Sequence, residues 1–377
     1  MADSSFLSAS AVSAADAPLA EVPFTETRVV AAHANVDSAW AKWWAQALND
    51  PRDVVFVNLA LAMMLTIWPA AALLYGLALT GHFSWWLVVP YGALWATWFD
   101  RFTLMLHCVC HRPLFNRRFK ALNDVVPWLV GTAFGQTPTA YFVHHMGMHH
   151  REGNLPADLS TTMPYQRDRF THWLHYWGRF MSFGLFELTS YHHRGGREKM
   201  VKRLLVGELT YWALAGALAY WVHLETTLIV FVIPVLLMRT LMMAGNWGQH
   251  AFVDPDDPVS DFKNSITCLN SRYNRRCFND GYHIVHHVKP SLHYTEMPVE
   301  FAQNQRLYGE HDAIVFDGLD FFEVWLLLML GQKRKLAAHF VHLPGAPRRN
   351  EAEVIALFER RLRPFPADWK PAAAPAE

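Results

Sequence analysis

Two long stretches of the chain carry no basic residue at all. No Lys or Arg occurs between Val54 and Asp100, and none occurs between Leu204 and Met238. A helix needs about 20 mainly apolar residues to cross the hydrocarbon core of a bilayer. Within lipid, a helix satisfies its own backbone hydrogen bonds. The sequence therefore predicts four transmembrane helices in two hairpins, at about residues 54–80, 83–106, 204–224 and 226–246.

Composition indicates that these spans carry a large polar part. The chain has 377 residues, of which 52% are hydrophobic and 18% are charged. This is too apolar for an ordinary soluble enzyme and too polar for a bundle of membrane spans alone. We predict an all-α integral membrane protein with a cytosolic helical cap. The formal net charge is zero, so nothing in the charge indicates nucleic acid as a partner.

The distribution of basic residues predicts the orientation of the spans. The two short hairpin loops, around residues 81–82 and 223–225, carry no Lys or Arg. Basic residues gather at the opposite ends of the spans, which places both termini and residues 112–203 in the cytoplasm of a multi-pass protein. The basic residues on this side are Arg101, Arg112, Arg117, Arg118, Lys120, Arg197, Lys199, Lys202 and Arg203.

The chain divides into a membrane domain and two tails. Residues 1–35 are Ala/Ser-rich and acidic, which predicts a disordered N-terminal tail. Residues 36–340 form the predicted membrane domain, and residues 341–377 are interpreted as a C-terminal tail. Tryptophans within residues 40–48 indicate a helix in the membrane surface or a short soluble amphipathic helix. The apolar stretches 125–134 and 321–330 are too short to span and are interpreted as interfacial or cap helices.

Two acidic residues lie within or near the predicted spans. Charged side chains at membrane depth are rare and usually functional, so Glu208 and Asp100 are candidates for a role of that kind. Asp100 has a simpler alternative, because it adjoins Arg101 and can pair with it locally.

Histidines recur in four short groups with spacings of three or four residues. Such spacings place imidazoles on one helix face about one turn apart, and neutral imidazole is the commonest protein metal ligand. Nine imidazoles and one carboxamide are too many for one metal ion and suit two. The candidate ligands are His107, His111, His145, His149, His150, Asn246, His250, His283, His286 and His287.

Other residues near these groups are assigned ordinary roles. Cys108 and Cys110 lie between two candidate ligands, which raises the alternative of a mixed His/Cys zinc site. We favour a site of histidines because the other groups contain no cysteine. His144, His192 and His193 lie closest to the pattern and are interpreted as surface or structural residues.

All four groups fall on the predicted cytoplasmic side, just beyond the bilayer. The second and fourth spans, extended through their ligands, would be roughly 42 and 38 Å long, against roughly 30 Å for the hydrocarbon core. The spans would therefore hold metals over the membrane surface. A metal transporter or a membrane haem protein would place its ligands near the bilayer midplane, and no predicted span carries a histidine in its interior.

A paired metal site above a membrane suits the oxidation of an alkyl chain. Breaking an unactivated C–H bond needs a strong oxidant, which two iron ions can supply from O2 with electrons from outside. Irving–Williams affinity alone would not select iron, so this choice rests on the context of the site. Asn246, one turn before His250, could hold a metal-bound water, or it could act as a helix-end cap.

The four groups resemble the histidine boxes of the membrane fatty acid desaturase superfamily. The boxes stand here as HCVCH, HMGMHH and HIVHH, and the segment GYHIVHHVKPSLHYTEMP resembles the family's last box. NWGQH resembles the NxxxH motif of acyl-CoA desaturases. The resemblance covers about residues 50–305. It implies two non-haem irons held by the nine named histidines, with Asn246 acting through water and O2 as co-substrate.

The resemblance implies a fatty acyl desaturase, with a related oxidative enzyme as the alternative. The second box has the spacing of alkane hydroxylases, and the first lacks the acidic residue that often follows its first histidine. Four spans and the final box favour a desaturase over an alkane hydroxylase. A membrane di-iron hydroxylase, acetylenase or decarboxylase that uses the same metals is the alternative. No HPGG motif of a fused cytochrome b5 domain occurs.

The resemblance also implies partners and a location. The expected substrate is an acyl-lipid or acyl-CoA, and the expected electron donor is a separate cytochrome b5 or ferredoxin. The endoplasmic reticulum is the expected membrane, with a plastid or bacterial inner membrane as alternatives. The sequence leaves open the chain length, the bond position and the carrier.

Overall fold

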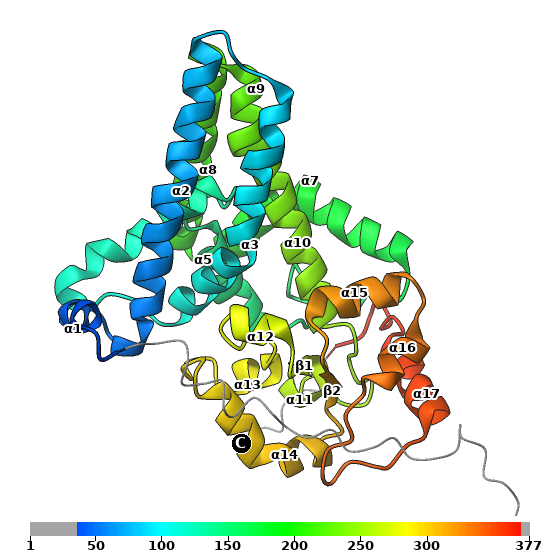
Figure 1. Ribbon diagram of the computed structural model, residues 1–377. Coiled ribbons are helices and arrows are strands. Elements are labelled where there is room, and N and C mark those ends of the chain that lie inside the picture. The colour runs from blue at the N-terminus through cyan, green and yellow to red at the C-terminus, as the bar shows by residue number, and fades with distance from the viewer. Residues whose placement is uncertain (1–35, 371–377) are drawn as a thin grey trace, which may run out of the picture.

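The computed structural model describes residues 36–370, and it is mostly helical. A column of long helices stands on a wider base of shorter elements (Figure 1). The column corresponds to the four predicted spans, with bounds shifted by a few residues. Its elements are α2 (Val54–Leu79), α3 (Val88–His111), α8 (Glu198–Trp221), α9 (Leu224–Thr227), η9 (Leu228–Val232) and α10 (Ile233–Gln249).

Two segments of the column are long and apolar enough to cross a membrane, judged by length and composition. These are Pro51–Leu79, which contains α2, and Leu224–Gln249, which contains α10. Their hairpin neighbours α3 and α8 are of similar length, but they are not among the segments that meet this criterion within residues 36–370. The structure thus supports two of the four predicted spans on this criterion.

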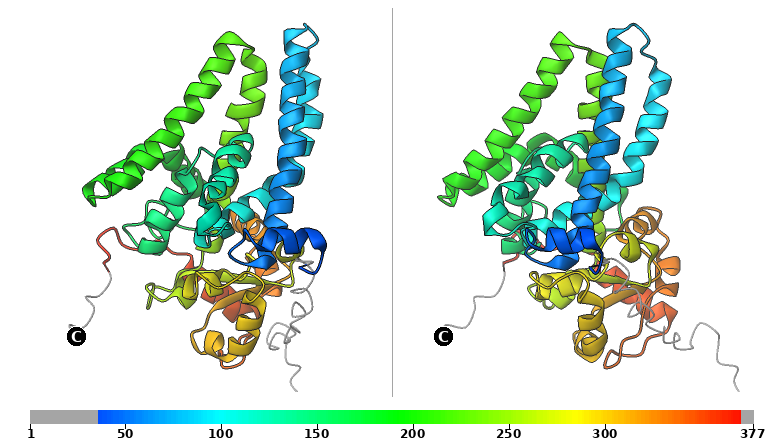
Figure 2. Two further views of the ribbon diagram at one scale, coloured as in Figure 1. Left: turned by 90° about the vertical axis from the view of Figure 1, so that its left-hand side faces the viewer. Right: turned by 60° about the vertical axis from the view of Figure 1, so that its left-hand side comes forward.

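The two hairpins stand next to each other with their tips on the same side (Figure 2). At the tips, the hydroxyl groups of Tyr75 and Thr227 are 2.8 Å apart. The rings of Phe83 and His223 lie 4.9 Å apart between centroids. Gly81 has a φ of +76°, a conformation that glycine adopts without a steric penalty. These contacts join the hairpins at the end far from the base.

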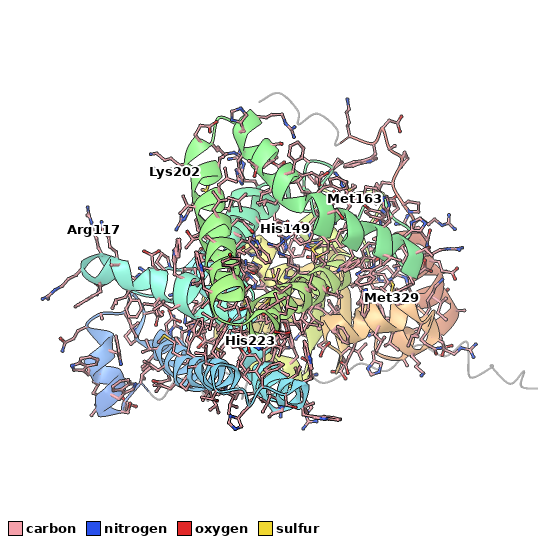
Figure 3. All side chains as sticks on the ribbon, turned by 90° about the horizontal axis from the view of Figure 1, so that it is seen from above. Arg117, His149, Met163, Lys202, His223 and Met329 are labelled. Carbon is pink, nitrogen blue, oxygen red and sulfur yellow. The ribbon has the colours of Figure 1, made fainter. Side chains whose placement is uncertain are left out.

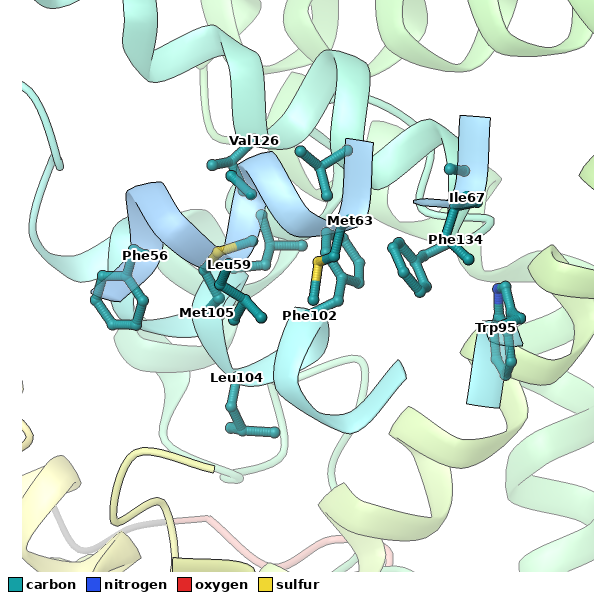
Figure 4. Packing of buried hydrophobic residues seen from close by; sticks show 14 of the residues in the cluster. Phe56, Leu59, Met63, Ile67, Trp95, Phe102, Leu104, Met105, Val126 and Phe134 are labelled. Carbon is teal, nitrogen blue, oxygen red and sulfur yellow. The ribbon is translucent and has the colours of Figure 1, made fainter. Parts of the chain in front are cut away.

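Buried aromatic and aliphatic side chains support the lower half of the column (Figure 4). The ring of Phe102 in α3 stacks on that of Phe134, with centroids 4.6 Å apart. Met63 and Ile67 of α2 and Met105 of α3 are almost completely buried around this pair. Burying each side chain of this size contributes about 1.5–3 kcal/mol. This packing fixes the lower end of α3, where His107 and His111 lie.

The base combines short helices with a small parallel sheet. Strand β1 (Ile266–Leu269) pairs with β2 (Ile314–Asp317) in parallel, with Ile266 opposite Ile314. The prediction of a wholly α-helical fold is therefore wrong in this respect. Both strands are only four residues long and almost fully buried, so they show no alternating pattern. The helices of the base are α11 (Asp261–Asn264), α12 (Arg272–Arg276), α13 (His283–Val288), α14 (Met297–Glu310), α15 (Phe321–Met329) and α16 (Lys333–Ala338).

The residues after 340, which the sequence analysis sets apart as a C-terminal tail, include a packed helix. Helix α17 (Glu351–Arg361) begins with a capping box formed by Asn350 and Glu353. Val354 and Phe358 of this helix are fully buried in a cluster with Phe252. This part of the chain therefore belongs to the base, whereas the predicted N-terminal tail, residues 1–35, lies outside the described residues.

Helix α7 (Phe170–Arg194) projects sideways from the foot of the column (Figure 1). The sequence placed residues 112–203 in the cytoplasm and predicted no long helix over residues 170–194. Helix α1 (Ala39–Ala45) coincides with the predicted tryptophan-rich surface helix, and its Trp43 is largely exposed. The remaining short elements are η4 (Pro51–Asp53), η5 (Trp85–Leu87), η6 (Arg117–Asp124), η7 (Val126–Val130), α4 (Gly131–Ala133), α5 (Ala140–His144), η8 (His145–His149) and α6 (His150–Glu152).

Candidate metal centre

Four helical segments bring the nine candidate histidines together beneath the column. His107 and His111 lie in the last turn of α3, and His250 follows the last residue of α10. The second group occupies η8 and the start of α6, where η8 has π-helical hydrogen bonding, a geometry frequent at functional sites. The last group lies on α13. Seen from above, His149 is near the middle of the molecule (Figure 3).

Five of the histidines form one cluster, which we call the five-histidine cluster. It consists of His107, His111, His145, His150 and His286, and one nitrogen of each ring lies within 4.8 Å of those of all the others. Neighbouring Nε2 atoms are closer still. They are 2.9 Å apart for His107 and His286, 3.0 Å for His111 and His145, 3.1 Å for His145 and His150, and 2.9 Å for His150 and His286.

The other four histidines form a second cluster beside the first, which we call the four-histidine cluster. Ring nitrogens of His149, His250 and His287 lie within 4.8 Å of one another. The Nε2 atom of His283 joins them, at 3.1 Å from that of His287 and 3.4 Å from that of His250. The two clusters adjoin, since His149 is followed directly by His150 in the chain. The structure therefore gathers all nine predicted histidines into two adjacent sets.

Each cluster contains one histidine that is oriented by a buried carboxylate. The Nδ1 atom of His107 is 3.0 Å from Asp280, and the Nδ1 atom of His149 is 2.7 Å from Asp158. In the four-histidine cluster, the Nδ1 atom of His250 also lies 2.9 Å from the backbone oxygen of Asn264. When Nδ1 donates to an oxygen, the neutral ring presents its lone pair at Nε2. These contacts therefore direct nitrogen lone pairs into the clusters.

The electrostatics of the centre favour uncharged imidazoles. Burial lowers the pKa values of His145, His283, His286 and His287 well below the ordinary value, and the neighbouring histidines lower them further. Burial alone would raise the pKa of Asp158, but His149 and the hydrogen bonds from His149 and Ser160 hold it below its usual range. Converging neutral nitrogens with charged carboxylates behind them fit a pair of divalent transition-metal ions.

Asn246, the tenth predicted site residue, belongs to neither histidine cluster. Its side-chain amide donates to the backbone oxygen of Ser160 at 3.0 Å and to the hydroxyl of Tyr176 at 2.7 Å. Its backbone oxygen accepts from the N–H of His250. Asn246 lies in the wall of the cavity described below. Its action through a metal-bound water stays a prediction.

The cysteines and other histidines that lie close to these groups in the sequence take no part in the two clusters. Cys108 and Cys110 belong to neither of the metal-binding groups found among residues 36–370, which consist of histidine alone. The ring of His192 is buried and its Nε2 lies 3.1 Å from the backbone oxygen of Val143. His193 is exposed and pairs with Glu198.

An apolar cavity leads to both clusters. It has a volume of about 370 Å³ and is lined by side chains of α3, α7, α8 and α10, a size suited to a small-molecule site. Its wall includes His107 and His145 of the five-histidine cluster and His149 and His283 of the four-histidine cluster. Apolar side chains form much of the rest, among them Phe180, Leu185, Leu188, Leu204 and Met242. The centre is thus reached through a space that suits a hydrocarbon.

The two carboxylates were not among the site residues predicted from the sequence. Asp280 lies three residues before His283, and Asp158 lies eight residues after His150. Both were detectable as acidic residues close to histidine groups, but proximity in the chain does not show which ring an acid contacts. Metal-binding histidines usually donate their second N–H to such a partner, and this rule is the signal that would have found them.

Replacing Asp158 or Asp280 by asparagine is expected to weaken metal binding by about 10- to 100-fold. The amide keeps the shape of the side chain but removes the charge that orients His149 or His107. The measurement is competition between each metal-loaded variant and a soluble chelator. Asp256→Asn is the matched control, because Asp256 pairs with Arg360 at the surface. Unchanged affinity in both site variants would mean that the carboxylates do not support the centre.

Comparison with known proteins agrees with this geometry. A search of curated proteins gives no significant match. A family model described as fatty acid desaturase matches residues 84–318. The match contains all four histidine groups and covers more than half of the chain. The chain therefore belongs to the fatty acid desaturase family.

Proposed function

We propose that the protein is an oxygen-dependent desaturase that introduces a double bond into a long acyl chain. The observation that carries this proposal is the apolar cavity, which connects the lower ends of the long helices with both histidine clusters. A hydrocarbon chain in this cavity would lie against histidines of each cluster. Membership of the fatty acid desaturase family supports an oxidoreductase that acts on such a chain.

The proposed cofactor is a pair of non-haem iron ions, as is typical of this family. The nine histidines of the two clusters would hold them, and Asp158 and Asp280 would orient His149 and His107. Imidazole suits iron among several metals. When bound, two irons supply the activation of O2 that the removal of hydrogen from an unactivated C–H bond requires.

The protein's own contribution is to hold the chain and to exclude water. In the proposed reaction, two hydrogens leave adjacent carbons, and O2 receives them with two electrons and two protons from outside to give two water molecules. The electrons would come from a separate donor, either cytochrome b5 or ferredoxin. Placing two neighbouring C–H bonds within reach of one site requires close positioning, which the walls formed by Phe180, Leu188 and Met242 would provide.

We further propose a multi-pass protein whose base faces the cytoplasm. The two segments with span-like length and composition support membrane insertion. A tag inserted at Gly81 is expected to be protected from protease in sealed vesicles with the cytoplasmic face outward. The same tag near the C-terminus is expected to be cleaved. Cleavage at Gly81 with protection of the C-terminus would contradict this topology. The endoplasmic reticulum is the proposed membrane.

Product analysis under isotope-labelled O2 tests the proposed reaction. The expected product is a chain with two hydrogen atoms fewer than the saturated substrate and no oxygen label, because both oxygen atoms leave as water. Mass spectrometry of lipids from a host that expresses the chain makes the measurement, with a host that expresses His286→Ala as the control. A labelled hydroxyl group on the chain would contradict the desaturase and indicate a hydroxylase.

A further inference from the structure

An ion pair lies in the wall of the apolar cavity, away from the histidines. Arg239 of α10 donates from Nη2 to Oε1 of Glu208 on α8, at 3.0 Å. Both residues line the cavity. The side chain of Glu208 is 6% exposed and that of Arg239 is 24% exposed. Charged groups placed among membrane-depth helices are expensive and usually functional, so this pair calls for an explanation.

The two partners of this ion pair differ in how many of their hydrogen-bonding groups are used. Besides Arg239, the carboxylate of Glu208 accepts from the hydroxyl of Thr137 at 2.6 Å and from the indole of Trp212 at 3.1 Å. Both of its oxygens are therefore used. A guanidinium has five N–H donors, and within the described residues Arg239 donates one hydrogen bond, to Glu208. Most of the unused hydrogen-bonding capacity of this ion pair therefore consists of the donors of Arg239.

An interhelical ion pair that only stabilises the packing of α8 against α10 does not fully explain the placement of Arg239. One N–H of Arg239 forms the ion pair with Glu208. Its remaining N–H donors are on a side chain that lines the cavity. When a hydrocarbon chain fills the cavity and excludes water, leaving such donors without an acceptor is unfavourable. A ligand that carries an acceptor oxygen would satisfy them, whereas a plain hydrocarbon would not.

The charge of the pair selects the kind of acceptor. Glu208 already neutralises Arg239, so a carboxylate or phosphate would bring an uncompensated negative charge into an apolar cavity. A hydroxyl or carbonyl oxygen accepts hydrogen bonds without that penalty. The cavity wall therefore favours a neutral oxygen function.

Arg239 lies well away from the histidine clusters along α10. An oxygen bound by Arg239 would therefore be separated from the substrate carbons that react at the metal centre. Arg239 precedes Asn246 by seven residues and His250 by eleven, which corresponds to about 10 Å and about 16 Å along a helix. We propose that Arg239 binds a hydroxyl or carbonyl oxygen on the hydrocarbon chain of the substrate. The preferred substrate is then an oxygenated chain. This inference rests on the proposed function, because it assumes that the cavity holds the chain to be oxidised.

Binding to the metal-free protein tests the inference without using activity. The probes are octadecane, which carries no oxygen, and a series of octadecanols with the hydroxyl at successive positions, each competing with a fluorescent hydrocarbon chain. At least one hydroxylated isomer is expected to bind about tenfold more tightly than the plain chain. The preference is expected to vanish in the double variant Arg239→Met with Glu208→Gln, which removes both charges while keeping similar volumes.

Two further variants make the result specific. Arg239→Lys keeps the charge but loses the guanidinium fork, so the preference is expected to fall while the protein stays folded. Arg179→Met with Glu187→Gln removes an ion pair on α7 that does not line the cavity, and this control is expected to keep the preference. Equal binding of all chains to the unaltered protein, or a preference that survives in the double variant, overturns the inference while the proposed function stands. Failure of every chain to displace the probe overturns both.

Discussion

Replacing His286 by alanine is expected to remove metal from the five-histidine cluster and to lower activity by more than about 100-fold. The Nε2 atom of His286 lies 2.9 Å from that of His107 and 2.9 Å from that of His150, so its ring links histidines of two other segments. Loss of a residue that only supports a ligand already costs 10- to 100-fold, and loss of the ligand itself is expected to exceed this. Metal content per chain and product formation are the two measurements.

Two controls separate this effect from damage to the fold. His193→Ala removes an exposed histidine that pairs with Glu198 and is expected to keep full metal content. Cys108→Ser together with Cys110→Ser is expected to retain both metals as well, because neither cysteine belongs to a histidine cluster. Loss of metal from the folded cysteine variant, with retention in His286→Ala, would show that the ligands are assigned incorrectly.

That these histidines come together was predictable from the sequence, because helical periodicity is a local property. Their role as metal ligands stays a prediction. Spacings of three and four residues place His107 with His111 and His283 with His286 and His287 on common helix faces, and the structure has these segments as helices. The division into clusters of five and four was not predictable. It depends on how four separate segments pack, and His149 and His150, adjacent in the chain, enter different clusters.

The long-range partners of charged residues were also not predictable from local sequence patterns. A local pair with Arg101 was one of two interpretations of Asp100. Its side chain instead pairs with Arg276 of α12, and Arg101 donates to it from its backbone N–H. Glu208 was noted as an acid within a span, but its partner Arg239 lies 31 residues away on another helix. Contacts of this kind follow from tertiary packing, which a single sequence does not specify.

Elements without a strong apolar pattern were also missed. Helix α7 mixes aromatic residues with histidines and arginines, so it was not apolar enough for a span, although Gly195 and Gly196 mark its end in the sequence. Strands β1 and β2 are short and pair across 44 intervening residues, from Leu269 to Ile314. By contrast, the two segments of span-like length and composition, Pro51–Leu79 and Leu224–Gln249, were predictable because a long apolar run is a local feature of the sequence.

Two glycines of α8 are expected to respond in opposite directions to substitution by alanine. At Gly207 an added Cβ would lie 1.8 Å from the backbone oxygen of Pro138, whereas at Gly216 nothing lies within 4 Å. Overpacking of this severity is expected to lower the free energy of unfolding by about 3 kcal/mol. Gly216→Ala is expected to raise it by about 0.5–1 kcal/mol, since alanine favours a helix interior over glycine. Thermal and chemical denaturation in detergent make the comparison.

The clash at Gly207 would also disturb the site, because the segment that it touches is attached on both sides. Thr139 donates to the backbone oxygen of Arg203, and Thr137 donates to Glu208, so Pro138 cannot move away without breaking contacts to α8. Helix α5 and His145 follow directly after this segment. Gly207→Ala is therefore expected to lower metal content as well as stability, with Gly216→Ala leaving metal content unchanged. Equal stability in the two variants would mean that the close approach of α8 to Pro138 does not hold this part of the fold.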